Sequence, residues 1–322
     1  MRLFLRSRAA FLTLTEYRPQ VSSWGAPSLI VNPVAGRGAA AKLLPRAQAG
    51  FAKAGIRDVL ITRWEGEEES LVTRAIASGV RSFVILGGDG TCTRVANAIL
   101  KSSTDCLVTV LPCGTGNDFA KTLGVSGYAP EEIADLVVRG DATRIDVGFA
   151  DENYFLNSCG FGFDASVLEA SNRVRFLKGD AVYIYAALGQ LFTYRGMEVS
   201  ANGAPGVKRG RMLMVTVSNG RYLGGAFKIA PHASVLDGQL DACFIGDSNV
   251  VERVKLFAGA MRGNHIGMPS VATASVQQLA LTFASNPLME MDGELRRARS
   301  KTVELKCVPR ALSVVAAPGA IV

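Results

Sequence analysis

Apolar and polar positions divide the chain into two regions with different patterns. From residue 27 to about residue 140, short apolar runs alternate with longer segments whose apolar residues recur at helical spacing. The runs are SLIV, DVLI, SFVILG and CLVTVLP, and each is followed by a loop and then by a helical pattern. Unbroken apolar runs are typical of parallel strands covered on both faces. This region is therefore expected to form a doubly wound α/β domain with a parallel sheet.

From about residue 141 the apolar segments are shorter, and many alternate with polar residues. Examples are TRIDVGFA, GRMLMVTVSNG, QLDACFIG and VQQLALTFA, interrupted by helical patterns at 179–194 and 250–261. This pattern predicts a mainly antiparallel, β-sandwich-like domain over residues 141–308. Residues 309–322 are expected to add a strand or a tail. The arginine-rich residues 1–26 are expected to form an N-terminal extension, either disordered or a targeting segment.

Charge narrows the choice of partners. The formal net charge at pH 7 is +7, from 35 Lys and Arg residues against 28 Asp and Glu residues. This balance suits an anionic ligand or an anionic membrane surface. The sequence contains no run of interleaved basic and aromatic residues, so nucleic acid is not an expected partner.

The six cysteines and two histidines restrict the chemistry further. The cysteines show no CxxC pairing, which argues against a zinc site or a disulfide scaffold and indicates buried thiols in a reducing compartment. With only two histidines, a histidine-ligated metal site or a histidine-dependent catalytic triad is not expected. No apolar run reaches the roughly 18 residues needed to span a bilayer. A cytoplasmic location is therefore expected.

Three glycine-bearing loops follow strands of the first region. They are NPVAGRG (32–38), GGDGT (87–91) and CGTGND (113–118). The carboxyl ends of parallel strands lie at one edge of a sheet, and main-chain N–H groups of glycine loops bind phosphates there. We therefore expect the three loops to meet and to bind phosphate, with Thr91 capping the following helix. Asp89 is then either a hydrogen-bonded turn residue or a group that acts on metal and phosphate.

Two common nucleotide-binding motifs fit the chain poorly. Gly36-x-Gly38-x-x-Ala41 is similar to a dinucleotide fingerprint, but the next strand ends in Thr62 and not in an acidic residue. The sequence contains no GxxxxGK[ST], so the P-loop lysine is missing. A nucleotide held here would depend on main-chain N–H groups, on Thr and Asn side chains and on nearby cations.

Acidic residues also occupy short turn-like motifs of the second region. They are Asp146 in RIDVG, Asp237 in SVLDGQLD, and Asp292 with Glu294 in MEMDGEL. Asp-Gly pairs are common in hairpin turns. Carboxylates and carbonyls in tight turns are also the ligands that Mg²⁺ and Ca²⁺ accept. Both interpretations stay open for each residue taken alone.

Taken together, the motifs resemble a known family. NPVAGRG, GGDGT, GTGNDFAKTLG, NGRYLGGAFKIAPHASVLDGQLD and MDGEL occur in the order and spacing of the diacylglycerol kinase catalytic-domain family, over residues 28–315. That family includes bacterial soluble diacylglycerol kinases, related lipid kinases and sphingosine kinases. The resemblance implies a Mg²⁺- and ATP-dependent kinase that phosphorylates a lipid hydroxyl, with diacylglycerol giving phosphatidic acid. Two alternatives are an NAD kinase-like enzyme, because NAD kinases share GGDGT, and an inactive protein that binds lipid or nucleotide.

The resemblance also implies roles for individual residues. Glu294 would be the general base, and Asp89, acting on the metal-bound phosphates, is the rival candidate for that role. Asp237 would hold a structural Mg²⁺ with the main-chain carbonyls of Ser234 and Gln239, and Asp146 would join its water network. The loops and the resemblance together assign to the nucleotide site Asn32, Pro33, Val34, Ala35, Gly36, Thr62, Gly87, Gly88, Asp89, Gly90, Thr91, Cys92, Thr93, Arg94, Gly114, Thr115, Asn117 and Asp118.

The chain departs from the family pattern directly after GGDGT. Many relatives carry a small apolar residue, then Asn or His, then Glu, whereas this chain carries Cys92, Thr93 and Arg94. An acid is therefore replaced by a cation close to the expected nucleotide. This replacement puts the roles of Thr93 and Arg94 in doubt and leaves that of Asp89 unchanged.

A kinase with a bilayer substrate is expected to contact the membrane surface transiently. Arg173, Arg175 and Lys178 lie next to Phe176 and the apolar helical pattern that follows, a combination that suits anionic headgroups. The same pattern also fits a helix packed on the β domain, which is the more common arrangement. Antiparallel edge strands of the second region could pair in a homodimer.

Overall fold

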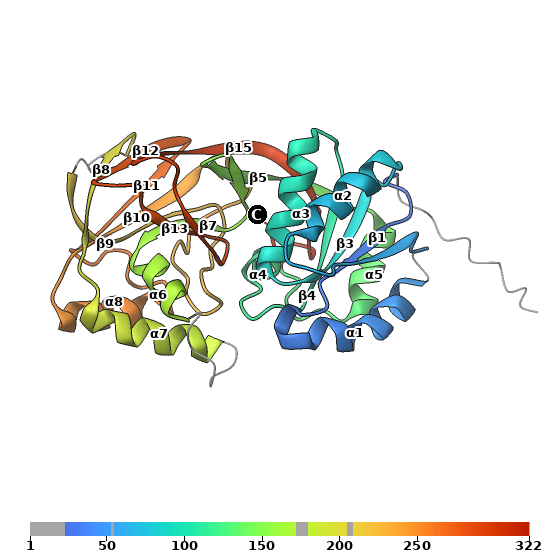
Figure 1. Cartoon of the computed structure of the whole chain (residues 1–322), viewed down its shortest axis with the longest axis horizontal. Coiled ribbons are helices and arrows are strands. Elements are labelled where there is room, and N and C mark those ends of the chain that lie inside the picture. Colours follow the sequence, from blue (N-terminus) through green and yellow to red (C-terminus); the bar gives the residue numbers. More distant parts are fainter. Residues whose placement is uncertain (1–22, 53–54, 172–179, 205–208, 322) are drawn as a thin grey trace, which may run out of the picture.

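The chain forms two domains that lie side by side in the computed structural model, which describes residues 23–52, 55–171, 180–204 and 209–321 (Figure 1). The first 22 residues of the predicted N-terminal extension lie outside the described residues. So does the basic segment around Arg175.

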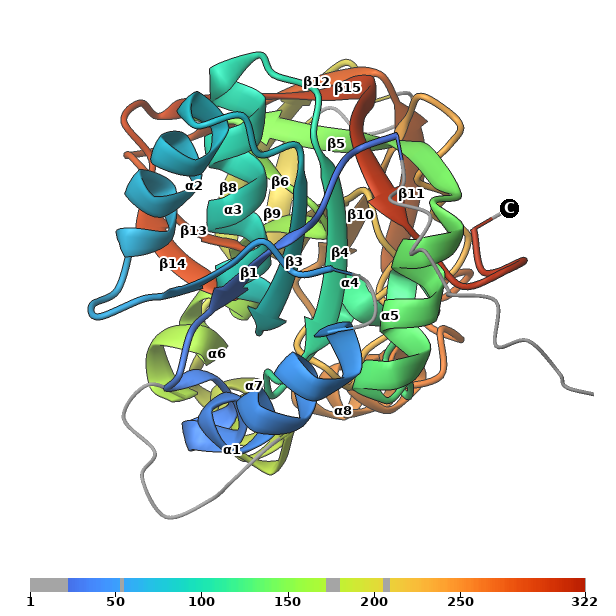
Figure 2. The same cartoon turned by 90° about the vertical axis from the view of Figure 1, so that its right-hand side faces the viewer.

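The first domain contains a parallel sheet with helices on both faces. Its elements are β1 (Ser28–Val31), α1 (Ala35–Phe51), β2 (Asp58–Ile61), α2 (Glu67–Ala77), β3 (Ser82–Gly87), α3 (Asp89–Ser102), β4 (Leu107–Pro112), α4 (Asp118–Thr122) and α5 (Pro130–Arg139). The strand order is β4-β3-β1-β2, with every pair parallel. Helices α2 and α3 pack together, and α1 packs on α5 across the sheet from them (Figure 2). The buried apolar runs of β1 and β3 account for this sandwich, as the sequence predicts.

The second domain is mainly antiparallel. Its elements are β5 (Ala142–Ala150), β6 (Asn153–Phe155), β7 (Ser158–Gly162), α6 (Phe163–Ser171), α7 (Asp180–Thr193), β8 (Met197–Asn202), β9 (Arg209–Ser218), β10 (Leu240–Gly246), α8 (Val250–Ala260), β11 (Val271–Val276), β12 (Gln278–Phe283), β13 (Leu288–Met291), β14 (Glu294–Arg297) and β15 (Thr302–Val315). Inward-facing residues such as Phe161, Val217 and Leu281 form its core. The predicted fold class is therefore confirmed for both regions.

Helix α6 is a feature that the apolar pattern does not predict. Its first residues continue the apolar run of β7, so the sequence CGFGF reads as one strand. The change from strand to helix occurs at Gly162, whose φ of +91° is accessible mainly to glycine. The glycine therefore redirects the chain where the hydrophobic pattern alone gives no signal.

Strand β15 joins the two domains. Its first half pairs antiparallel with β12 and β5, and Ser313 and Val314 pair parallel with β4 of the first domain. The register shifts between Val308 and Leu312, where Arg310 has a φ of +50°. The expected strand after residue 308 is present as the second half of β15. The boundaries near residues 140 and 308 stay predictions, because β5 and β15 serve both domains.

Candidate active site at the junction of the two domains

The three glycine loops of the first domain meet at one edge of its sheet, as expected. Asn32 Nδ2, after β1, donates a hydrogen bond to Thr91 Oγ1 at 3.0 Å. A Cβ on Gly88 would lie 2.9 Å from Gly114 Cα, so the second and third loops touch through their backbones. A Cβ on Gly36 would lie 2.0 Å from the carbonyl oxygen of Cys113. Glycine is thus required where the loops converge.

Thr91 does not cap helix α3 as expected. The helix begins at Asp89, Gly88 occupies the N-cap position, and no side chain accepts a capping hydrogen bond. The Thr91 hydroxyl instead accepts the hydrogen bond from Asn32. The first main-chain N–H groups of α3 consequently have no side-chain cap, which suits binding of an anion.

Other residues expected at the nucleotide site differ in solvent exposure and in whether their side chains are available to a ligand. Asn117 closes its own loop, because its Oδ1 accepts from Gly114 N at 2.7 Å and its Nδ2 donates to Gly114 O at 3.0 Å. Val34 is 74% exposed within the first loop, and Thr62 is buried after β2. The Cys92 side chain lies in the hydrophobic core, where burial raises the pKa of its thiol, so only its main chain can reach a ligand.

Asp89, which is partly buried, forms an acidic pair with buried Asp118. Asp89 Oδ1 accepts from Phe119 N at 3.0 Å. Asp118 accepts from Gly225 N of the second domain, at 3.0 Å for Oδ2, and lies 3.3 Å from Lys121 Nζ. Burial, and then the charge of Asp118, raise the pKa of Asp89 to about 7. Two neighbouring carboxyl groups of this kind can bind a proton or a divalent cation.

Glu294, from the second domain, lies against the GGDGT loop that carries Asp89. Its Oε2 accepts from Arg296 Nη2 at 2.8 Å, and its Oε1 accepts from Arg94 Nη1. A Cβ on Gly90 would lie 3.2 Å from Glu294 Oε1, so the carboxylate lies directly against the GGDGT loop. The structure therefore brings Asp89 and Glu294, the two candidate bases, to the same side of the molecule.

Asp292 is a site residue whose role sequence reasoning missed. It has a φ of +49°, and its carboxylate accepts from three successive main-chain N–H groups, of residues 156–158, at 2.6, 2.8 and 3.0 Å. It also accepts from Thr93 Oγ1 at 2.7 Å. Glu294 lies in the same turn as Asp292, and Asp292 thus anchors this turn to helix α3. The Asp-Gly pair in MDGEL signalled a turn, but nothing in the sequence identified these partners.

Three residues expected at a structural metal, Ser234, Asp237 and Gln239, lie in one turn before β10, and the fourth, Asp146, lies in β5. Asp237 is exposed, and its Oδ1 accepts from Gln239 N at 3.0 Å. Asp146 is buried, and its two carboxylate oxygens accept from Gly238 N and Arg310 N, each at 2.7 Å. Asp146 therefore fixes both this turn and the register shift in β15.

This turn provides the oxygen donors that a hard divalent cation prefers. Burial, and then the charge of Asp237, raise the pKa of neighbouring Asp241, so negative charge accumulates here. Among the described residues no group of three or more His, Cys, Asp or Glu side chains is arranged to hold a metal. A cation at Asp237 would therefore depend on the main-chain carbonyls of Ser234 and Gln239.

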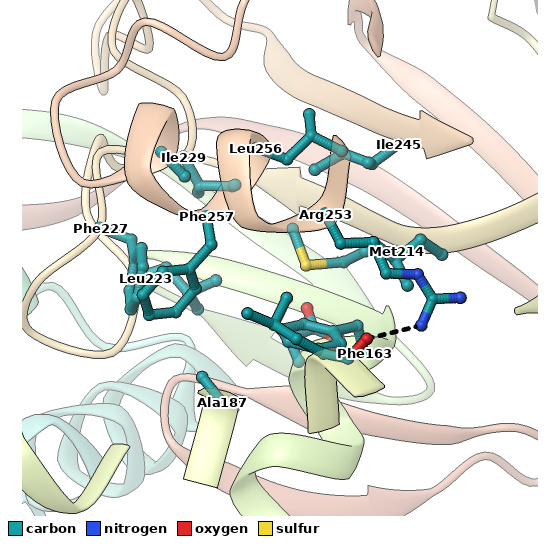
Figure 3. Close-up of a pocket in the computed structure, with 14 residues that line it drawn as sticks. Phe163, Ala187, Met214, Leu223, Phe227, Ile229, Ile245, Arg253, Leu256 and Phe257 are labelled. Atoms are coloured by element: carbon teal, nitrogen blue, oxygen red, sulfur yellow. Dashed lines mark hydrogen bonds between the residues drawn. The ribbon is translucent and has the colours of Figure 1, made fainter. Parts of the chain in front are cut away.

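A separate apolar cavity lies in the second domain among α6, α7 and α8 (Figure 3). Its volume is about 50 Å³, and its lining includes Phe163, Leu223, Phe227 and Phe257. Asp164 also lines it, and burial raises the pKa of that carboxyl to about 7. The cavity has room for about one or two water-sized groups. A longer apolar chain would enter only if the surrounding helices separated.

The fold and site define a two-domain protein in which glycine loops of an α/β domain face a carboxylate from a β-rich domain. Residues 27–150 match the diacylglycerol kinase catalytic domain, and residues 157–316 match the YegS C-terminal NAD kinase beta sandwich-like domain. The chain belongs to the diacylglycerol kinase catalytic-domain family.

Named relatives span most of the chain. A diacylglycerol kinase from Mycobacterium tuberculosis is 29% identical over 300 residues, which cover 90% of this chain and 95% of the relative. A probable YegS-like lipid kinase from Pseudomonas putida is 31% identical over 236 residues, which cover 72% of this chain and 79% of the relative. The crystal structure of a putative diacylglycerol kinase from Bacillus anthracis superposes with a TM-score of 0.73 at 22% identity, over 92% and 98% of the two chains. That similarity shows the shared fold.

Proposed function

We propose that this protein is an ATP-dependent lipid kinase that transfers the γ-phosphoryl group to a lipid hydroxyl, with diacylglycerol as acceptor and phosphatidic acid as product. The observation that carries the proposal is the contact of Glu294, from the second domain, with Gly90 in the GGDGT loop of the first. A base and a phosphate-binding loop are thereby adjacent. The relative from Mycobacterium tuberculosis is named a diacylglycerol kinase, which supports this acceptor, and the relative from Pseudomonas putida is named a probable lipid kinase, which supports the broader class.

In this proposal the loops bind the triphosphate through main-chain N–H groups. The uncapped start of α3 and the loop closed by Asn117 offer these donors. Lys121 adds positive charge beside Asp118. Phosphoryl transfer asks mainly for positioning and for neutralisation of charge. A divalent cation, when bound, would supply part of that neutralisation.

Glu294 then takes the proton from the attacking hydroxyl. The hydroxyl oxygen forms a bond to the γ-phosphorus, the bond from that phosphorus to the β–γ bridging oxygen breaks, and ADP leaves. The liberated proton goes to a carboxylate oxygen of Glu294. Because Arg94 and Arg296 hold the two oxygens of Glu294, its orientation is fixed before the acceptor arrives.

We also propose that the second domain contacts the lipid surface through helices α7 and α8. Tyr185, Leu188 and Phe192 follow one stripe of α7 with exposed fractions of 53%, 44% and 65%. Val251 and Val254 of α8 are 67% and 44% exposed. Apolar side chains at this spacing suit partial insertion among headgroups. None of the described helices is long and apolar enough to cross a bilayer.

The proposal is tested by a kinase assay of the purified protein with labelled ATP. The acceptor panel contains diacylglycerol, a sphingoid base, phosphatidylglycerol, an undecaprenyl-type alcohol and NAD, and mass spectrometry identifies the product. Labelled phosphatidic acid supports the proposal as stated. Labelling of another lipid would keep the lipid kinase and change its substrate, and labelling of NAD alone would overturn it.

A further inference from the structure

Arg94 lies between two carboxylates from different domains. From α3 its Nη2 donates a hydrogen bond to Glu68 Oε1 at 3.3 Å, and its Nε lies 3.2 Å from Glu68 Oε2 in an ion pair that lacks hydrogen-bond geometry. Its Nη1 contacts Glu294 Oε1, and exposed Glu65 lies 3.7 Å from the same nitrogen. The guanidinium plane therefore uses one side for Glu68 and the other for Glu294.

Burial makes the pair with Glu68 the fixed part of this arrangement. The Glu68 side chain is fully buried, whereas that of Arg94 is 17% exposed and that of Glu294 is 20% exposed. The Glu68 carboxylate also accepts a hydrogen bond from Gly66 N, at 3.1 Å. A buried carboxylate that lost its cation would carry a large desolvation penalty. Glu68 consequently holds the long Arg94 side chain in one orientation.

The charges alternate along a line that ends at the proposed base. Glu68 on α2 contacts Arg94 on α3, which contacts Glu294 on β14, which contacts Arg296. Two positive and two negative charges alternate on this line, and exposed Glu65 adds a third negative charge beside Arg94. An acid at position 94, as in the family pattern, would face two carboxylates and could hold neither. The arrangement thus belongs to the departure of this chain from the pattern.

We propose that Arg94, held by Glu68, is a positioning residue that sets the orientation of the Glu294 carboxylate for proton transfer, and not a phosphate ligand. The inference rests on the proposed function, because it assigns Glu294 as the base. Small errors in the placement of a reacting group lower the rate of the chemical step much more than they lower substrate binding.

Kinetics of a double-mutant cycle test this role. Arg94→Lys keeps the charge but loses the planar fork that serves two carboxylates at once. We expect kcat to fall between about ten- and a hundredfold, with the KM for ATP unchanged within about twofold. In a Glu294→Gln background, Arg94→Lys should have almost no further effect, because the residue acts through Glu294.

Other outcomes would overturn the proposal. If Arg94 were a phosphate ligand, Arg94→Lys would raise the KM for ATP and would lower kcat equally in the wild-type and Glu294→Gln backgrounds. If the pair of Arg94 and Glu294 were purely structural, a folded Arg94→Lys variant would keep the wild-type kcat. Glu68→Gln provides a second variant, in which the Arg94 orientation loosens without a change at position 94, and we expect its kcat to fall in the same direction.

Failure of the proposed function is distinguishable from failure of this inference. The same four variants of the Arg94 and Glu294 cycle are compared in thermal unfolding, which needs no substrate. Non-additive changes in Tm would show that Arg94 holds Glu294 even if the wild-type protein phosphorylated no lipid. Absence of lipid phosphorylation by the wild type would overturn both the proposed kinase function and the catalytic role of the contact between Arg94 and Glu294. Additive changes in Tm would overturn the contact itself.

Discussion

At the scale of single residues, the candidate site combines charged groups from both domains. Glu294 has an arginine on each carboxylate oxygen. Asp89 instead lies partly buried beside Asp118, and burial and then the charge of Asp118 raise the pKa of Asp89 to about 7. Glu294 as the general base therefore stays a prediction that rests on its position against the GGDGT loop. Asp89 stays the rival candidate, because a carboxyl group with a pKa of about 7 is suited to exchange protons as well as to interact with cations.

Removal of the negative charge from Glu294 should separate catalysis from nucleotide binding. Glu294→Gln keeps the size of the side chain but cannot take the proton, so kcat should fall about a hundred- to ten-thousandfold. ATP affinity, measured by calorimetry, should change little. Glu304→Gln, on the exposed face of β15, is the matched control and should keep normal turnover. A Glu294→Gln variant with near-normal kcat would remove Glu294 from the role of base.

Buried Asp164 should make stability depend on pH. Its pKa rises from 3.8 in the unfolded chain to about 7 in the folded protein, because burial disfavours the charged form. The stabilising contribution is therefore complete below about pH 4 and is lost as the pH rises through about 7. Between pH 5 and pH 8 the free energy of unfolding of the wild type should therefore fall. For Asp164→Asn that fall should be smaller by roughly 2 kcal/mol.

Thermal unfolding at both pH values measures this effect. Asp135→Asn, at an exposed position of α5, is the control and should keep the wild-type pH dependence. An equal loss of Tm between pH 5 and pH 8 in wild type and Asp164→Asn would contradict the raised pKa.

At the scale of elements, helix α3 organises the site. Its N-terminus carries the GGDGT loop, Thr93 one turn later binds Asp292, and Arg94 binds Glu294. The gathering of the glycine loops could be predicted, because parallel strands of one sheet end at the same edge. The contacts of Thr93 and Arg94 could not, because Asp292 lies 199 residues beyond Thr93 and a local pattern does not specify a distant partner.

Loss of the Thr93 hydroxyl should weaken the connection between α3 and the turn that carries Glu294. Thr93→Val is nearly isosteric but leaves one oxygen of buried Asp292 without that donor, and the unfolding free energy should fall by about 1–3 kcal/mol. Because Glu294 follows in the same turn, kcat should also fall several-fold. Thr93→Ser keeps the hydroxyl and is the matched control. Equal stability of the Val and Ser variants would show that the hydrogen bond is not important.

The apolar stripe of α7 should contribute to binding of lipid surfaces. Phe192→Ser removes a 65% exposed aromatic side chain, and Leu188→Ser removes a neighbour on the same stripe. Co-sedimentation with phosphatidylglycerol-containing vesicles should weaken by roughly fivefold or more for the double variant. Trp64→Ser, at a 60% exposed position of the first domain, is the control. Equal weakening by both changes, or by neither, would argue against α7 as the docking surface.

At the scale of the whole molecule, the two domains are connected in two ways. Strand β15 continues from the antiparallel sheet into the parallel one. At the site, side chains cross the junction, as in the contacts of Thr93 with Asp292 and of Asp118 with Gly225. Asp146 contributes to the first connection, because it holds the register shift of β15 at Arg310 and the turn at Gly238. Anything that orders the turn before β10 therefore also stabilises the passage of β15 between domains.

A cation at Asp237 should consequently stabilise the protein as a whole. Binding to the folded state alone raises stability with ligand concentration, so millimolar Mg²⁺ should raise Tm by about 2–5 °C. Asp237→Asn should abolish this rise, since the turn would lose its exposed carboxylate, and should lower activity through the same connection. Asp135→Asn should respond to Mg²⁺ as the wild type does. If chelation of divalent ions and addition of Mg²⁺ left the Tm of the wild-type protein identical, the turn would be a hydrogen-bonded loop and not a metal site.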